Sequence, residues 1–132
     1  MVEEIATFID SESTRFSLGT STFINSLPDE PNRASSVIET PGAPADYVFA
    51  NDLPVNENAR VAITTRSTSS ATARADANAA WVAVQKIANE ALSGKTWLRA
   101  APVQSPFFLK RDEQNRPMFQ FNVACTRRTT ST

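Results

Sequence analysis

Two segments of this chain alternate apolar and polar residues with the period of a β-strand. One runs from residue 59 to residue 66 and the other from residue 118 to residue 125. Successive side chains of a strand point to opposite faces of the sheet, so each segment offers one face to a core. The residues on the two expected core faces are Ala59, Val61, Ile63, Thr65, Phe119, Phe121, Val123 and Cys125. The chain therefore has to fold around a sheet that needs a covering layer.

A long helix pattern between these two segments supplies that layer. Apolar residues recur at three- and four-residue spacings, which predicts a helix from about Ser70 to Leu92. They are Ala77, Ala80, Trp81, Val84, Ile87, Ala88 and Ala91. The hydroxyl side chains of residues 67–70 are candidate N-caps, and Gly94 suits the left-handed position after a helix C-terminus.

The remaining patterns add shorter elements. Val2, Ile5, Ala6 and Ile9 have the spacing of a short amphipathic helix. Residues 35–40, 97–103 and 107–110 favour strands, and residues 20–27 are compatible with either a strand or a helix end. The polar run 111–116 predicts the turn of a terminal hairpin, in which Asn115 can adopt a positive φ. The sequence thus predicts an α+β fold: a mostly antiparallel sheet of about four to five strands, one long helix packed on it and a short N-terminal helix.

The length of 132 residues suits a single domain spanning residues 1–132. Residues 41–57 contain three prolines and exceed the usual length of a loop, so we expect an extended arm there. Residues 126–132 carry two arginines and no core-forming residue, which predicts a flexible basic tail. The sequence shows neither a membrane-spanning run nor a signal peptide, so we expect a soluble protein made in a cytoplasm.

The small net charge of −1 conceals an uneven distribution along the chain. Residues 1–57 contain ten acidic and two basic side chains, whereas residues 58–132 contain eleven basic and four acidic ones. The halves therefore carry net charges of −8 and +7. Two interpretations stay open: acidic loops fold back onto a basic sheet within one subunit, or oppositely charged faces pair between copies.

The usual catalytic patterns are missing from this sequence. It has no histidine, one cysteine and three glycines, which excludes a disulfide within the chain, a Rossmann fingerprint and a nucleophile elbow. The Gly94-Lys95-Thr96 string lacks the earlier glycine of a P-loop. Cys125 shares a face with Phe121 and is expected in the core, and Asp112 and Glu113 are expected to stay solvated. We predict no catalysis, no cofactor and no metal site.

The terminal hairpin combines basic and aromatic residues, as single-strand binders do. Lys110, Arg111 and Arg116 lie close in sequence to Phe107, Phe108, Phe119 and Phe121. A pI of about 5.4 is opposite to the footprint of a dedicated nucleic-acid binder. A small nucleic-acid-binding module therefore remains an alternative function.

Three segments give the chain a familiar layout: FINSLPDEP (Phe23–Pro31), VIETPG (Val37–Gly42) and LKRDEQNRPMFQFNV (Leu109–Val123). With a basic strand ending at Arg66 and one long helix, this order resembles the small tail terminator proteins of long-tailed bacteriophages. The most characteristic piece is the turn 111–116, in which Asn115 stands where many relatives have glycine.

The resemblance implies a structural virion protein at the head–tail junction, made in the bacterial host cytoplasm. It implies a homo-hexameric ring that caps the head-proximal end of the tail tube, ends tube polymerisation and provides the surface for head–tail joining. The implied partners are further copies of the chain, the major tail tube protein, a head completion or connector protein, and double-stranded DNA passing without sequence specificity, with no membrane. A head–tail connector or head completion protein of the neck is the alternative within the same structure.

Charged residues of the expected arm, strand and turns are the candidates for such interfaces. They are Asp29, Glu30, Asp46, Asp52, Arg60, Arg66, Arg111, Asp112, Glu113 and Arg116. We expect the arm and the turn 111–116 to be mobile or exposed in an isolated subunit and ordered in the assembly.

Overall fold

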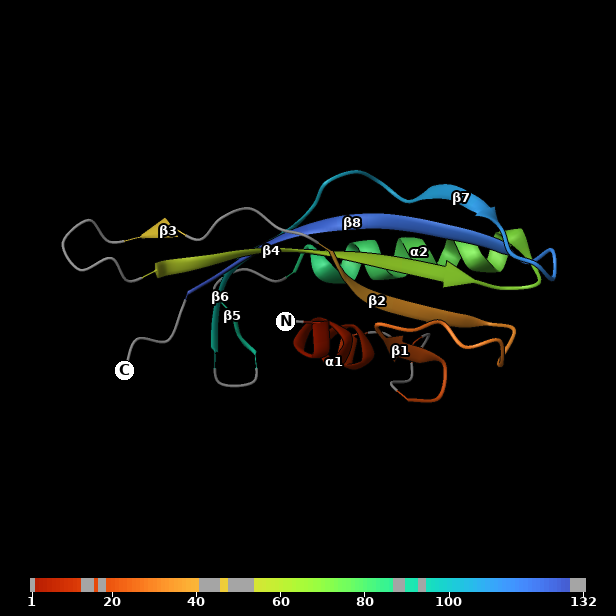
Figure 1. Ribbon diagram of the computed structural model, residues 1–132, viewed down its shortest axis with the longest axis horizontal. Helices are drawn as coiled ribbons and strands as arrows, with labels where there is room; N and C mark the ends of the chain where they lie inside the picture. The colour runs from red at the N-terminus through yellow and green to blue at the C-terminus, as the bar shows by residue number, and fades with distance from the viewer. Residues whose placement is uncertain are drawn as a thin grey trace.

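The computed structural model describes residues 2–12, 16, 19–40, 46–47, 54–86, 90–92 and 95–128. Within these ranges the chain forms two helices and eight strands, shown in Figure 1. Their order is α1 (Val2–Glu12), β1 (Thr22–Ile24), β2 (Ala34–Thr40), β3 (Asp46–Tyr47), β4 (Pro54–Arg66), α2 (Ser70–Val84), β5 (Glu90–Leu92), β6 (Lys95–Pro102), β7 (Phe107–Arg111) and β8 (Pro117–Arg128).

The antiparallel pair of β4 and β8 is the spine of the sheet. It runs from Asn56 opposite Arg128 to Arg66 opposite Met118. Strands β2 and β3 pair with the edge of β4 that faces away from β8. Strands β6 and β7 pair with the edge of β8 that faces away from β4. Strand β1 lies parallel beside β2, and β5 lies antiparallel beside β6. One sheet therefore has the main order β1-β2-β4-β8-β6-β5, with β3 and β7 off this path.

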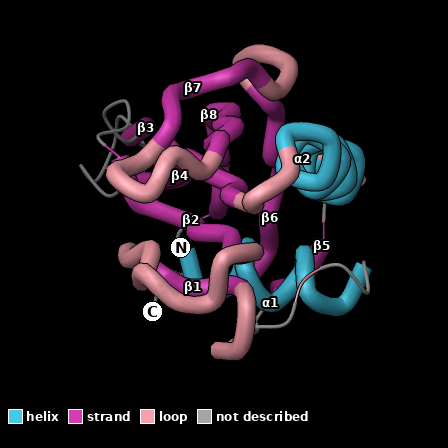
Figure 2. The backbone as a smooth tube through the Cα atoms, turned by 90° about the vertical axis from the view of Figure 1, so that its right-hand side faces the viewer, coloured by secondary structure: helices cyan, strands magenta, loops and turns pink. Residues whose placement is uncertain are grey.

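Both helices cover the same face of the sheet. Helix α2 contacts β4, β6 and β8, and α1 packs against α2, β1 and β2. Figure 2 shows the two helices on neighbouring parts of that side. The larger core residues between these layers are Ile5, Ile9, Phe16, Val37, Val61, Ile63, Val84, Phe121, Val123 and Cys125. The two alternating segments of the sequence thus supply the sheet side of the core.

Small residues let α2 lie close to the sheet. The alanines at positions 73, 77, 80 and 83 are buried along one side of the helix. Ser69 caps the N-terminus, because its Oγ accepts a hydrogen bond from the Thr72 backbone at 3.4 Å. The Thr65 hydroxyl donates to the carbonyl of Ala73 at 2.8 Å and fastens the helix start to β4.

A bidentate ion pair fastens α2 to the loop before β2. The Arg33 guanidinium donates to both carboxylate oxygens of Asp76, at 2.9 and 2.8 Å. The Asp76 side chain is buried, so this arrangement gives an interior charge its counter-ion. The hydrogen bond to Asp76 raises the pKa of Arg33 against the opposing effect of burial.

The prediction for the long helix was wrong at its C-terminal end. Helix α2 ends at Val84 with Gln85 as its C-cap, so Gly94 does not cap it, and Glu90–Leu92 form β5 instead. Leu92 pairs with Lys95 in the antiparallel ladder with β6. Helical spacing of apolar residues continued through the sequence to Ala91, but pairing with β6 overrides this local pattern. Residues 87–89 and Gly94 lie outside the described residues.

The sheet also has more strands than the four to five predicted. The extra ones, β1, β3 and β5, have two or three residues each and are defined by their pairing with the longer strands β2, β4 and β6. One pair, β1 with β2, is parallel.

Strands also occupy parts of the predicted arm and tail. Within the expected arm, residues 46–47 form β3 and residues 54–57 begin β4, and residues 126–128 extend β8 into the expected tail. The rest of both segments lies outside the described residues. The single domain, the arm and the flexible tail otherwise stay predictions.

Several local predictions are confirmed. The N-terminal helix, the capping by Ser69 and the terminal β7–β8 hairpin are present, and residues 20–27 contain a strand. Asn115 has φ 62°. Cys125 is buried at 1% exposure beside Phe121 and Val123. Among the described residues, no helix is both long and apolar enough to span a membrane.

We expect Phe121→Ala to lower the free energy of unfolding by about 3–5 kcal/mol. Phe121 is fully buried between the sheet and both helices, so truncation leaves a cavity. Urea denaturation of the purified protein measures the change. Val82→Ala, at a site that is 52% exposed, is the control and should cost much less. Equal effects of the two substitutions would contradict this packing.

Candidate interaction site

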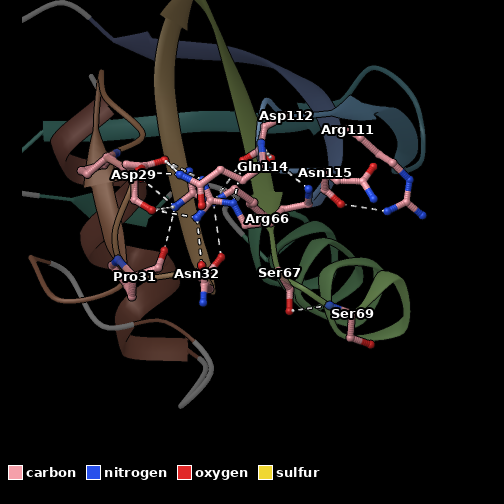
Figure 3. Close-up of polar contacts among 12 residues, drawn as sticks. Asp29, Pro31, Asn32, Arg66, Ser67, Ser69, Arg111, Asp112, Gln114 and Asn115 are labelled. Carbon is pink, nitrogen blue, oxygen red and sulfur yellow. Dashed lines mark hydrogen bonds and ion pairs between the residues drawn. The ribbon is translucent and has the colours of Figure 1, made fainter.

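Three segments distant in sequence meet where β4 ends and β8 begins. They are the loop between β1 and β2, the C-terminal residue of β4, and the turn between β7 and β8. Figure 3 shows their polar side chains and backbone groups converging at this end of the sheet. We call Asp29, Asn32, Arg66, Asp112, Gln114 and Arg116 the clamp.

The turn at residues 112–116 organises itself around Asp112. One carboxylate oxygen, Oδ1, accepts hydrogen bonds from the backbone N–H groups of Gln114 and Arg116, at 3.0 and 2.8 Å. The backbone of Asp112 donates to the carbonyl of Arg116, and that of Asn115 donates to the carbonyl of Asp112. Aspartate favours such turns because its short side chain reaches the backbone two residues on, and asparagine tolerates the positive φ at residue 115.

The Arg116 side chain joins this turn to the β1–β2 loop. Its Nε donates to Asp112 Oδ2 at 2.7 Å, and its Nη2 donates to Asp29 Oδ1 at 2.8 Å. Its Nη1 donates to the Asp29 carbonyl and to Asn32 Oδ1, at 2.7 and 3.0 Å. Burial lowers the pKa of Arg116, but the hydrogen bonds from its guanidinium to Asp112 and Asp29 outweigh this and raise it overall.

The Arg66 side chain holds the same loop through backbone carbonyls. Its Nη2 donates to the carbonyls of Pro28 and Pro31 at 2.6 and 2.7 Å, and its Nε donates to that of Asn32 at 3.3 Å. The side chain is only 3% exposed. Burial and the neighbouring Arg116 charge lower the pKa of Arg66, against opposing effects of Asp112, Asp29 and Glu30.

Asp112 is the anion closest to both guanidinium groups. Its Oδ2 lies 2.7 Å from Arg116 Nε and 4.0 Å from Arg66 Nε. Burial alone would raise the pKa of Asp112. Hydrogen bonds from the backbone and side chain of Arg116 and from the backbone of Gln114 reverse this and lower it. The prediction of a solvated carboxylate is therefore wrong for Asp112, whereas Glu113 is exposed as expected.

The structure brings four of the predicted interface residues together in the clamp: Asp29, Arg66, Asp112 and Arg116. Glu30 and Arg111 lie at its exposed margin, where Arg111 donates to the carbonyl of Asn115. Arg60 is exposed on β4, away from this cluster. Asp46 belongs to β3, its side chain is not described, and Asp52 lies outside the described residues. Their roles in contacts between subunits stay predictions.

Sequence reasoning missed two members of the clamp. Asn32 accepts from Arg116 through Oδ1, and the Gln114 amide donates to both carboxylate oxygens of Asp29 at 2.7 and 2.6 Å. Neutral amides in polar loops carry no distinguishing sequence signal. The two prolines of residues 28–32 indicated a turn at Asp29 and Asn32. They did not indicate that this turn contacts the β7–β8 turn.

Ion pairs within the subunit connect the two charged halves of the chain. Asp29 pairs with Arg116, and Glu12 pairs with Lys86 at 3.1 Å. For Asp29 the fold-back interpretation is confirmed, whereas the second pair joins α1 to the residue after the C-cap of α2. These pairs neutralise part of the net charge of each half locally, although Asp29 and Lys86 stay exposed.

The exposed margin of the clamp is a shallow depression of about 360 Å³. Lys110, Arg111 and Glu113 line it together with clamp residues. Beside it runs β7, whose five residues are all exposed, including Phe107, Phe108 and Leu109. Among the described residues, no group of three or more carboxylate or thiol side chains is arranged to hold a metal ion. The site is thus a rigid, polar support for an exposed strand.

Comparison with known proteins gives matches to a sequence family and to solved structures. The sequence model of the family described as "Bacteriophage tail terminator protein" matches residues 11–129. A chain from the structure titled "Virion of native gene transfer agent (GTA) particle" is similar in fold, with a TM-score of 0.62 and 15% sequence identity. This similarity covers 94% of each chain. No curated protein sequence matches.

We expect Arg66→Lys to lower the free energy of unfolding by about 1.5–3 kcal/mol. A single ammonium group cannot reproduce the forked donors that bind the carbonyls of residues 28–32. Urea denaturation measures the effect. Arg60→Lys on the same strand is the matched control, because Arg60 is exposed. If both variants unfold alike, Arg66 does not hold the loop.

The Asp112 carboxylate should make stability depend on pH. Its pKa in the folded state lies below the ordinary 3.8, so its contribution is present above that pH and is lost as the pH falls through the folded pKa. We expect the melting temperature of the wild type to exceed that of Asp112→Asn at about pH 7 and the gap to close below about pH 4. Glu113→Gln is the control and should show no such gap. A gap that persists undiminished into acid would refute this role.

Proposed function

The chain belongs to the bacteriophage tail terminator family, and we propose that it caps the head-proximal end of the phage tail tube as a ring. In this role it ends tube polymerisation and provides the surface on which the head is joined. It is a structural component of a phage tail end, and a non-catalytic role is consistent with that family.

The extent of the family match is the observation that carries this proposal. The match spans residues 11–129, which include α2 and all eight described strands. The virion chain of similar fold is covered to 94% of its length. The match therefore covers the whole described sheet and α2, rather than a short motif shared between unrelated proteins.

The clamp gives the subunit the rigidity that such a role requires. A protein that stops polymerisation must present one fixed surface to the last ring of the tube. The buried charges of Arg66 and Arg116 connect β4, β8 and the β1–β2 loop, so these segments hold one arrangement. We propose that this end of the sheet, with its exposed charges, faces another protein of the tail or neck.

The proposed assembly is a homo-hexamer at the head–tail junction. Its partners are the major tail tube protein on one side and a head completion or connector protein on the other. Double-stranded DNA passes through the lumen without sequence-specific contacts. The chain is made in the cytoplasm of the bacterial host.

The structure gives less support to a nucleic-acid-binding module. Phe119 and Phe121 are buried in the core, and the Arg116 guanidinium is occupied within the clamp. These three of the seven basic and aromatic residues that suggested this alternative therefore serve the fold. Phe107, Phe108, Lys110 and Arg111 remain exposed at the edge of the sheet.

Removal of this chain from its phage should produce overlong tail tubes, because nothing stops polymerisation at the correct length. Negative-stain electron microscopy of lysates measures tube length, and expression of the wild-type chain in trans should restore it. Tails of normal length beside detached, DNA-filled heads would contradict termination and indicate a connector. Normal, infectious particles would exclude both roles.

A further inference from the structure

Strand β7 is an exposed edge of the sheet with an unusual apolar content. Among the described strands it pairs with β8 alone, and Phe107, Phe108 and Leu109 are 36%, 50% and 36% exposed. Edge strands offer unpaired backbone groups to other chains, and proteins usually protect them by charges, bulges or covering segments. Three consecutive exposed apolar residues at such an edge indicate a contact surface.

The structure holds this edge in a fixed position. Phe108 packs edge-on against the buried ring of Phe119, with ring centroids 5.8 Å apart. The clamp fixes the turn that follows β7 through Asp112 and Arg116. A register shift between Phe108 and Lys110 marks a bulge in the strand. The bulge interrupts the regular ladder of β7, so this edge does not suit pairing with any strand that it meets. Its fixed position suits one specific partner.

The opposite edge of the sheet differs in charge. At this end of the molecule the strands follow the order β1-β2-β4-β8-β7, so β1 and β7 lie on opposite sides. Figures 1 and 2 both show β7 at the top and α1 with β1 at the bottom. Helix α1 contains four acidic residues and no basic one, whereas β7 ends in Lys110 and Arg111. Asp10 on α1 is exposed.

We propose that the β7 edge of one copy docks against the side formed by α1 and β1 of the next copy. This inference rests on the proposed function, since it names the surfaces through which the ring closes. Oppositely charged surfaces on opposite sides of a subunit generate head-to-tail contacts, and these form rings when the rotation closes. The apolar residues of β7 supply the contact area, and the charges set its orientation.

A two-fold contact between two β7 edges offers the cations of this strand no acidic partner. Strands related by a two-fold axis run antiparallel, so full overlap places Lys110 opposite Phe108 and Arg111 opposite Phe107 of the other copy. The acidic side of the second copy supplies counter-charges that its own β7 lacks.

Site-specific photo-crosslinking in assembled tails tests the contact directly. A photoreactive phenylalanine analogue replaces Phe108 in full-length chain that complements the null phage, and mass spectrometry identifies the linked peptide. The expected product joins residue 108 to α1 or β1 of a second copy. The same analogue at Ala71, exposed on α2, is the control and should give no such product.

Each other outcome of this experiment overturns the inference. A product with the tail tube protein or a neck protein assigns the edge to that partner. A product between two β7 strands shows a two-fold contact. Incorporation into tails at the wild-type level without any product shows that the edge is unoccupied.

A charge exchange provides the second test. We expect Lys110→Glu to reduce crosslinking between neighbouring copies by about fivefold, the effect of roughly 1 kcal/mol from exposed charges. Adding Asp10→Lys should recover part of the lost crosslinking, because each contact then has a glutamate on β7 opposite a lysine on α1. Lys110→Arg keeps the charge and should behave as wild type. Melting temperatures close to that of the wild type verify folding. Lack of recovery in the double variant would refute the orientation proposed for the contact.

These tests separate the contact from the function. Crosslinks between copies combined with tubes of normal length in the null phage would keep the contact and reject termination. Overlong tubes in the null phage combined with crosslinks from residue 108 to another protein would keep termination and reject the contact.

Discussion

Two guanidinium groups of like charge are buried at one end of the sheet, and much of the local structure follows from neutralising them. Arg66 is surrounded by backbone carbonyls, and Arg116 is paired with Asp29 and Asp112. A buried cation without partners would be costly, so the β1–β2 loop and the β7–β8 turn must both be in place. The clamp thus makes the folded positions of these two loops depend on the pairing of β4 with β8.

This coupling connects the interior of the subunit to its outer edge. The turn fixed by Asp112 directly follows β7, and the buried ring of Phe119 supports Phe108 from below. On the helix side, Arg74 lies over the same ring, 4.8 Å from its centroid. The apolar edge is therefore supported at its C-terminal end and beneath Phe108. A docking surface that is already ordered loses little conformational entropy on binding.

The parts predicted correctly from sequence are those that local patterns determine. Alternation located β4 and β8, and a hydroxyl side chain located the start of α2, because these depend on neighbouring residues. Tertiary contacts decided the rest: Glu90–Leu92 form a strand against β6, which pairs with the distant β8, and Arg66 is buried beneath a loop. The charge split indicated that acids and bases would meet, but the pairing of Asp29 with Arg116 depends on the sheet topology.

The distribution of charge also bears on how strongly copies of the chain associate. Asp29 and Glu12 already have partners within the subunit, so only part of the acidic half is available to neighbours. Exposed ion pairs contribute at most about 1 kcal/mol each, and an edge of five residues is small beside a typical interface of about 1,600 Å². A single contact of the proposed kind is therefore weak. In a closed ring on the end of a tube, each subunit contacts two neighbouring subunits and also the tube. Under the proposed function we therefore expect the chain to assemble where a tube presents a template and to stay dispersed elsewhere, which suits a component that must act only at the tail end.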